Sequence, residues 1–116
     1  MEGARAGPVG SAVLPSEVQV SSRVRAQVRE RTQVAEEDLD LEYPGRATRN
    51  HFEPAGVRVI DLLPALTAAE REMPTYALRN SHWNERGNAI AAREIADSLA
   101  PLVRELALAR VGSARN

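Results

Sequence analysis

The apolar positions of the first third of the chain predict a strand followed by a helix. A short apolar run at 12–14 is ended by Pro15, which is typical of the last residues of a buried strand. Ser16 has Gln19 three positions later, and this pair predicts a capping box at a helix start. One amphipathic helix, from about Glu17 to Gln33, is predicted by valines that recur every four residues: Val20, Val24 and Val28.

The middle third predicts a loop, a helix and a second strand. Acidic residues crowd 36–42, which we interpret as a loop, and Pro44 suits the first turn of a shorter helix that runs to about Glu53. Three of the four residues 57–60 are β-branched and apolar, which predicts a strand. Asp61 follows this strand, where we expect it to cap a short helix.

The last third predicts a brief extended piece over 75–78, a polar loop over 79–86 and a long helix. The helix is indicated by apolar residues at spacings of three and four: Ala91, Ile95, Leu99, Leu102 and Leu106. Pro101 lacks an N–H and crowds the carbonyl of Asp97, so we expect it to kink or split this helix. The order of elements predicts an α/β domain with a parallel sheet over residues 12–110, between a disordered lead-in at 1–11 and a flexible tail at 111–116.

Composition limits what such a domain does. The chain has 116 residues, of which 43% are hydrophobic, enough for one small core. Its 15 basic residues, all arginine, nearly balance 16 acidic ones, so the basic excess that nucleic-acid binding requires is missing. Cysteine is absent, which excludes disulfides, thiolate metal sites and thiol nucleophiles. We expect no membrane span, because no stretch approaches the ~20 apolar residues that one requires, and no signal peptide in this chain.

The polar loop at 79–88 carries the densest chemical functionality. His82 is one of two histidines and suits a base near neutral pH. Trp83, the only tryptophan, is either a packing anchor or a contact for substrate. Asn84 is placed to cap the last helix by accepting N–H bonds from Arg86 or Gly87, and Gly87 suits close packing.

This block resembles a known family. Residues 80–88 are similar to the pattern Asp-x-His-Trp-Asn-x-x-Gly-Asn that closes the domains of SGNH (GDSL) hydrolases, in the branch of alginate-type polysaccharide O-acetylation proteins. Residues 56–64 and 14–20 are similar to two preceding segments of that branch. The resemblance covers about Val13 to Leu106. It implies a carboxyl-terminal portion of the domain, with a partial three-layer flavodoxin-like fold, a short parallel sheet and flanking helices.

The resemblance also implies roles for individual residues. His82 corresponds to the catalytic histidine, which deprotonates a serine in a Gly-Asp-Ser block. The orienting aspartate of the family is replaced by Asn80, which holds an imidazole but does not stabilise an imidazolium. This change predicts severe impairment unless Glu85 or another acid supplies the charge. No serine of the chain lies in a Gly-Asp-Ser context, and Ser11, after Gly10, lacks the aspartate.

Two further candidates lie outside this block. Asp61 is either the helix cap described above or an acid partner of His82, and the cap alone accounts for it. His51 is most simply a solvated surface residue. A metal site built from His51, His82 and a carboxylate matches no recognised ligand spacing, so we expect neither a metal nor a cofactor.

The sequence therefore predicts a truncated SGNH hydrolase-like protein. Its parent chemistry is ester hydrolysis or O-acyl transfer through a serine ester, with His82 as general base and the nucleophile outside this chain. The alternative is a non-catalytic remnant that serves as a binding or structural module. The partners implied are an acylated carbohydrate or small ester, and an amino-terminal half in trans or a second copy in a homodimer. The family branch often works in the periplasm or outside the cell.

Overall fold

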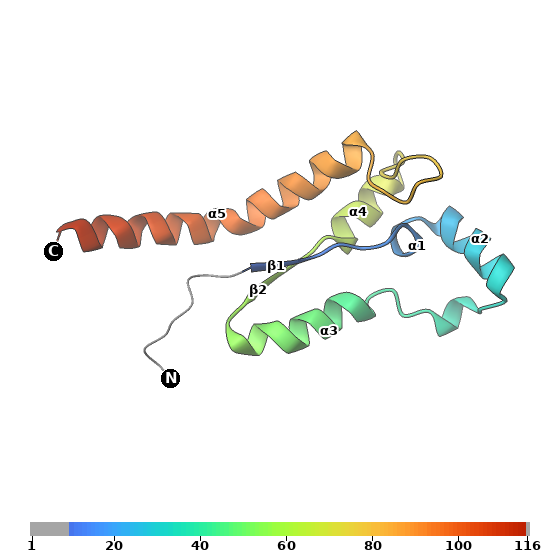
Figure 1. Cartoon of the computed structure of the whole chain (residues 1–116), viewed down its shortest axis with the longest axis horizontal. Coiled ribbons are helices and arrows are strands. Elements are labelled where there is room, and N and C mark those ends of the chain that lie inside the picture. Colours follow the sequence, from blue (N-terminus) through green and yellow to red (C-terminus); the bar gives the residue numbers. More distant parts are fainter. Residues whose placement is uncertain (1–9, 116) are drawn as a thin grey trace.

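A computed structural model describes the backbone of residues 10–115 and the side chains of residues 10–112 (Figure 1). Residues 1–9, most of the expected lead-in, lie outside this range. The elements, in chain order, are β1 (Gly10–Val13), α1 (Glu17–Val20), α2 (Ser22–Thr32), η1 (Glu36–Asp38), α3 (Tyr43–Phe52), η2 (Glu53–Ala55), β2 (Arg58–Asp61), α4 (Leu63–Glu70) and α5 (Glu85–Arg115).

The two strands form a parallel sheet. Gly10 pairs with Arg58 and Val13 with Asp61, and the N–H of Leu62 donates to the carbonyl of Val13 at 3.2 Å. The expected mixed α/β class with a parallel sheet is therefore confirmed. The extended piece expected at 75–78 does not join this sheet, because Tyr76 instead forms an antiparallel bridge with Trp83.

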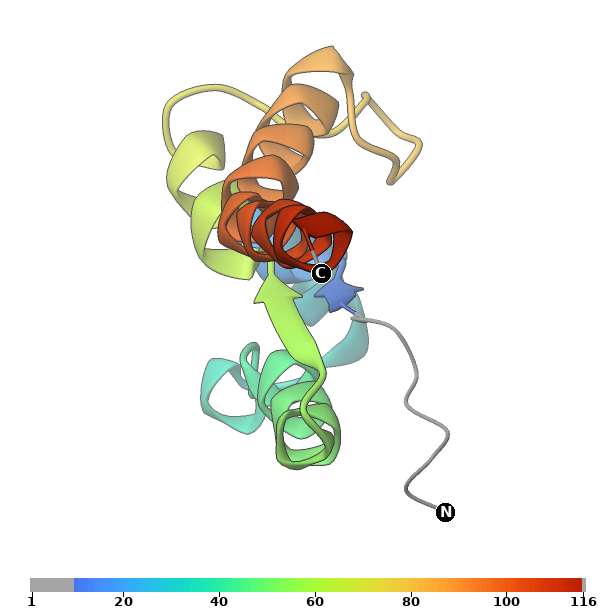
Figure 2. The same cartoon turned by 90° about the vertical axis from the view of Figure 1, so that its left-hand side faces the viewer.

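Helices lie on both faces of the sheet (Figure 2). Ile60 of β2 points into a core that it shares with Leu66 of α4 and Ala91 of α5. The next residue, Asp61, points to the opposite face and pairs with Arg49 of α3. Two strands are too few to show the complete three-layer flavodoxin-like fold that the family resemblance implies.

The single helix expected over 17–33 is wrong. Ser21 has an extended backbone (φ −99°, ψ 112°) that separates α1 from α2, and its hydroxyl accepts the N–H of Val24 at 3.2 Å. Serine competes with the helix for backbone groups in this way, so the break coincides with a new N-cap. Val20 is buried, whereas Val28 on α2 is 38% exposed. The valine stripe therefore does not pack as one face.

Proline or glycine marks both ends of the expected shorter helix, and a third expected break, at Pro101, is absent. The expected shorter helix is present as α3, with Pro44 in its first turn, and Gly56 adopts the left-handed φ of 81° after η2. Pro101 does not split α5, which continues to Arg115 and includes most of the expected tail. Figure 1 shows α5 change direction along its length, the kind of bend that an internal proline produces.

The core is small and mostly aliphatic. Its buried hydrophobic members are Val20, Ile60, Leu62, Leu66, Tyr76 and Ala91. The second half of α5 extends past this core (Figure 1) and exposes large apolar side chains, namely Val103, Leu106, Leu108 and Val111. Among the described residues, no helix combines the length and apolar character needed to cross a membrane.

Candidate functional site

His82 lies on a tight hairpin that precedes α5. The hairpin is closed by the Tyr76–Trp83 bridge and by a hydrogen bond of 2.7 Å from the N–H of Ala77 to the carbonyl of His82. At its turn, Arg79 and Ser81 have left-handed φ values of 60° and 58°. Such values are strained for residues with a Cβ and persist only where the surroundings impose them.

Asn80 holds the His82 ring through Nδ1. The backbone N–H of His82 donates to Asn80 Oδ1 at 3.0 Å, which identifies the atom at that position as the oxygen of the amide. His82 Nδ1 lies 2.8 Å from the same Oδ1 and 2.9 Å from the Asn80 carbonyl oxygen.

Both neighbours of Nδ1 are oxygen atoms that only accept hydrogen bonds. The proton of the neutral ring therefore lies on Nδ1, and Nε2 keeps its lone pair. Within residues 10–112, Nε2 has no hydrogen-bond partner and no hydroxyl is bonded to the ring. The free nitrogen is the one that a general base requires.

The ring faces a cleft of about 330 Å³ at the carboxyl end of β1. Leu14 and Pro15, which follow β1, form one side of it. The remaining lining residues come from the hairpin and the first turn of α5: Tyr76, Ser81, His82, Trp83 and Asn88. The carboxyl ends of parallel strands are where α/β proteins bind ligands.

Two aromatic residues build the apolar wall of this cleft. Tyr76 is buried and its hydroxyl donates to the carbonyl of Pro15 at 3.0 Å. Burial raises the pKa of the Tyr76 phenol, and the neighbouring Trp83 side chain opposes that rise only in part. Trp83 is half-buried and packs against the core, so it anchors the hairpin while one side of it lines the cleft.

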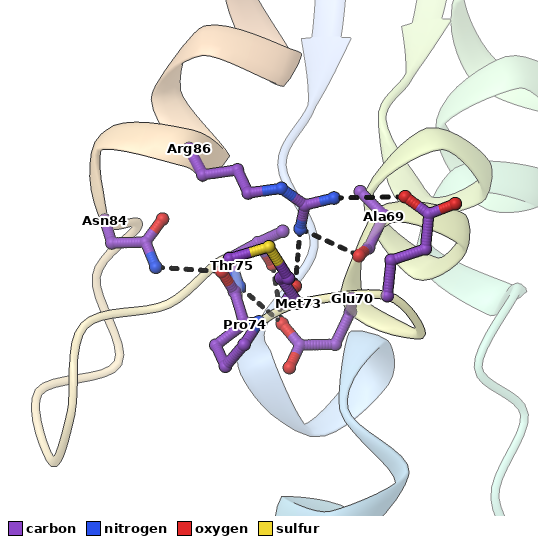
Figure 3. Close-up of polar contacts among 8 residues, drawn as sticks. Ala69, Glu70, Met73, Pro74, Thr75, Asn84 and Arg86 are labelled. Carbon is purple, nitrogen blue, oxygen red and sulfur yellow. Dashed lines mark hydrogen bonds and ion pairs between the residues drawn. The ribbon is translucent and has the colours of Figure 1, made fainter.

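The base of the hairpin is fixed to the start of α5 (Figure 3). Asn84 Oδ1 accepts the N–H of Gly87 at 2.9 Å and so caps the helix, while Asn84 Nδ2 donates to the carbonyl of Pro74 at 2.9 Å. A Cβ built on Gly87 would lie 2.2 Å from the carbonyl oxygen of Thr75, so only glycine fits there. Arg86 Nη1 donates to the carbonyls of Ala69 and Met73.

Asp61 bonds to α3 and α4 and not to His82. Its Oδ1 accepts the N–H of Leu63 at 3.1 Å at the start of α4, and its Oδ2 pairs with Arg49 at 2.9 Å. It lines a separate, larger cavity of about 750 Å³ to which His82 does not contribute. In the described part of the chain, neither Asp61 nor Glu85 bonds to the His82 ring.

The other histidine takes no part in the cleft. His51 is exposed at the end of α3, where its ring meets that of Phe52 edge-on at 4.8 Å between centroids. Among the described residues, no group of three or more histidine and acidic side chains is placed to hold a metal ion.

Sequence reasoning did not identify the arginine contacts. Arg49 reaches Asp61 across twelve positions, and Arg86 reaches carbonyls thirteen and seventeen positions away. Backbone carbonyls carry no sequence signal, so nothing in the pattern pointed to Arg86. For Arg49, only its place on a helix next to a predicted strand offered a hint.

A comparison with protein families identifies the domain. Residues 12–113 match the family described as the SGNH hydrolase-like domain of the acetyltransferase AlgX. The chain belongs to this family. The match includes the hairpin, the cleft, β2 and the last two residues of β1 in this SGNH hydrolase-like domain, and confirms the resemblance drawn from residues 80–88. No curated protein and no solved structure shows a significant match to the chain.

Proposed function

We propose that this chain supplies the proton-transferring part of an O-acyl transfer site, with His82 as general base. The observation that carries the proposal is the pair of oxygen atoms at Nδ1, because they leave Nε2 free at the edge of an open cleft. Membership of an SGNH family described by an acetyltransferase supports acyl transfer as the reaction class. The nucleophile is a serine from outside residues 10–115, either in a longer chain or in a second polypeptide.

The proposed reaction proceeds in two balanced steps. His82 Nε2 takes the proton of the serine hydroxyl as the oxygen attacks the acyl carbonyl, and the imidazolium returns this proton to the leaving alcohol. The products are a serine ester and the free alcohol of the donor. In the second step, Nε2 deprotonates an acceptor hydroxyl or water, the new ester or acid forms, and the proton returns to the serine.

Asn80 takes the place of an orienting carboxylate. In serine proteases the same Asp-to-Asn change costs about 10⁴ in turnover because it selects the wrong tautomer. Here the carbonyl of Asn80 also accepts from Nδ1, so the correct tautomer is kept without a carboxylate. Asn80 does not supply the negative charge that stabilises the imidazolium, and we expect turnover to be lower for this reason alone.

We assign the substrate class as an acylated carbohydrate. The cleft offers one apolar wall, formed by Trp83 and Tyr76, beside polar groups of Ser81 and Asn88. Aromatic walls with polar edges suit the faces and hydroxyls of sugar rings. Trp83 therefore has two roles in the proposal, as an anchor of the hairpin and as a substrate contact.

The test is the acetyl content of polysaccharides in the organism that makes the protein. His82→Ala, introduced at the native gene, is expected to lower alkali-released acetate to the level of a deletion strain. His51→Ala removes the other histidine and is expected to leave acetate unchanged. Unchanged acetate in the His82→Ala strain would contradict the proposal and favour a non-catalytic binding or structural module.

A second measurement tests the external nucleophile. The purified chain is expected to cleave an activated acetyl ester no faster than its His82→Ala variant. Covalent acetylation of one of its own serines, lost with His82, would refute the claim that the nucleophile lies outside residues 10–115.

A further inference from the structure

One residue, Asn84, donates hydrogen bonds to the backbone at the base of the hairpin. Asn84 serves three consecutive carbonyls: its Nδ2 donates to Pro74 at 2.9 Å and to Tyr76 at 3.4 Å, and its backbone N–H donates to Thr75 at 2.9 Å. Thr75 is fully buried. A cap for α5 needs only the Oδ1 contact with Gly87, so the Nδ2 contacts require a separate explanation.

The segment that Asn84 holds determines where His82 lies. Tyr76 pairs with Trp83, and the next residue, Ala77, donates its N–H to the carbonyl of His82. A shift of residues 74–76 would therefore pass directly to His82 through the hairpin. Figure 3 shows Asn84 reaching this segment from the α5 side, while Arg86 reaches Met73, the residue just before it.

We infer that Asn84 is a positioning residue for His82, in addition to its role as the helix cap. Oδ1 caps α5, while Nδ2 fixes the register of the hairpin so that the His82 ring stays in the cleft. The inference rests on the proposed function of His82, but its geometry is independent of acyl transfer. Glu70 supports it from the other side, because its carboxylate accepts both the N–H and the hydroxyl of Thr75 at 2.8 and 2.7 Å.

The two roles of Asn84 are separable by substitution. Asn84→Ser and Asn84→Asp both keep a good N-cap oxygen for Gly87. Both remove the Nδ2 donor, and the aspartate also places a negative charge against two carbonyl oxygens. Asn88→Ser is the matched control, because Asn88 lies one turn later and lines the same cleft, yet its Nδ2 donates only to the carbonyl of Asn84.

The readouts are amide hydrogen exchange and the ring nitrogen signals of His82. In both Asn84 variants we expect exchange at the N–H of Ala77 to rise about tenfold or more, while the N–H of Gly87 stays within about twofold. The His82 ring is expected to shift toward the tautomer mixture that exposed His51 shows in the same sample. Asn88→Ser is expected to change neither signal.

Two results would overturn the inference. One is wild-type exchange at Ala77 and wild-type His82 signals in the Asn84→Ser variant. The other is a general loss of protection in that variant, including the N–H of Leu66 in α4, which would make Asn84 a residue of the whole fold. Neither readout involves acetyl transfer, so these results stand apart from the polysaccharide test.

Discussion

At the scale of single residues, the site depends on the hydrogen bonds between two oxygen atoms of Asn80 and Nδ1 of His82. The sequence predicted that an amide at this position holds the imidazole but does not stabilise an imidazolium. The structure adds that the backbone carbonyl, which no substitution removes, accepts from Nδ1 beside the side-chain oxygen. Sequence alone does not predict this contact, because it depends on the left-handed turn at Arg79 and Ser81.

Restoring the carboxylate is expected to increase activity. Asn80→Asp keeps an oxygen at Nδ1 and adds the charge that stabilises the imidazolium, so we expect His82-dependent acetylation in cells to rise by about tenfold, or roughly 1.4 kcal/mol. Asn50→Asp is the control, because it makes the same change on the exposed surface of α3, outside the cleft. Equal acetylation in the Asn80→Asp and wild-type strains would show that the charge has no part in the reaction.

Ionisation of Tyr76 is expected to lower the stability of the fold at alkaline pH. Burial raises its pKa above the ordinary value of 10.0, so the unfolded chain loses this proton first as the pH rises. The contribution of the buried phenol to stability is therefore fully present below pH 10 and is lost as the pH rises from there through the pKa of the folded state. The chain has no lysine or cysteine to titrate in the same range.

Urea unfolding from pH 8 to 11 measures this loss. A Tyr43→Phe variant leaves Tyr76 as the sole tyrosine. If the free energy of unfolding of this variant stays constant above pH 10, the result would contradict the burial of the phenol.

At the scale of elements, local sequence predicted which helices and strands form better than it predicted where they end. α3, β2 and the start of α5 follow from proline, glycine and apolar spacing, because these signals act within one turn. The helix break at Ser21 comes from a local serine cap that the apolar spacing does not reveal, whereas the pairing of Tyr76 with Trp83 depends on how the hairpin folds. The valine stripe, whose members are four residues apart, continued across the break and concealed it.

Two glycines of α5 provide a matched pair for the contact between this helix and the hairpin. Gly87→Ala drives a methyl group into the carbonyl of Thr75 and is expected to cost about 1–3 kcal/mol of unfolding free energy. Gly112→Ala meets open space near the exposed end of α5 and is expected to change the unfolding free energy by less than about 0.5 kcal/mol. Equal effects in thermal unfolding would show that α5 does not press on Thr75.

At the scale of the whole molecule, the chain is extended for its length. Its radius of gyration is 18.3 Å, against about 13 Å for a compact chain of this size. The two-stranded sheet and the exposed apolar end of α5 account for the difference. Composition predicted enough apolar residues for a core, but four of the large ones lie on the part of α5 that extends beyond it.

Hydrogen exchange along α5 is expected to divide the helix. Amides from Ala91 to Leu99 lie where the helix packs on the core and should exchange slowly, whereas those from Val103 to Gly112 should exchange close to the rates of an open chain. Uniform protection along α5 would contradict this expectation and show that the exposed end is covered in solution, as in a homodimer.

The central claim, that Asn80 prepares His82 to act as a base, is tested most directly by the position of one proton. In the His51→Ala variant, His82 is the only histidine, and its ring nitrogens are distinguished by long-range ¹H–¹⁵N correlation at a pH where the ring is neutral. The account predicts a proton on Nδ1 and a bare Nε2. A ring that carries its proton mainly on Nε2 would contradict it.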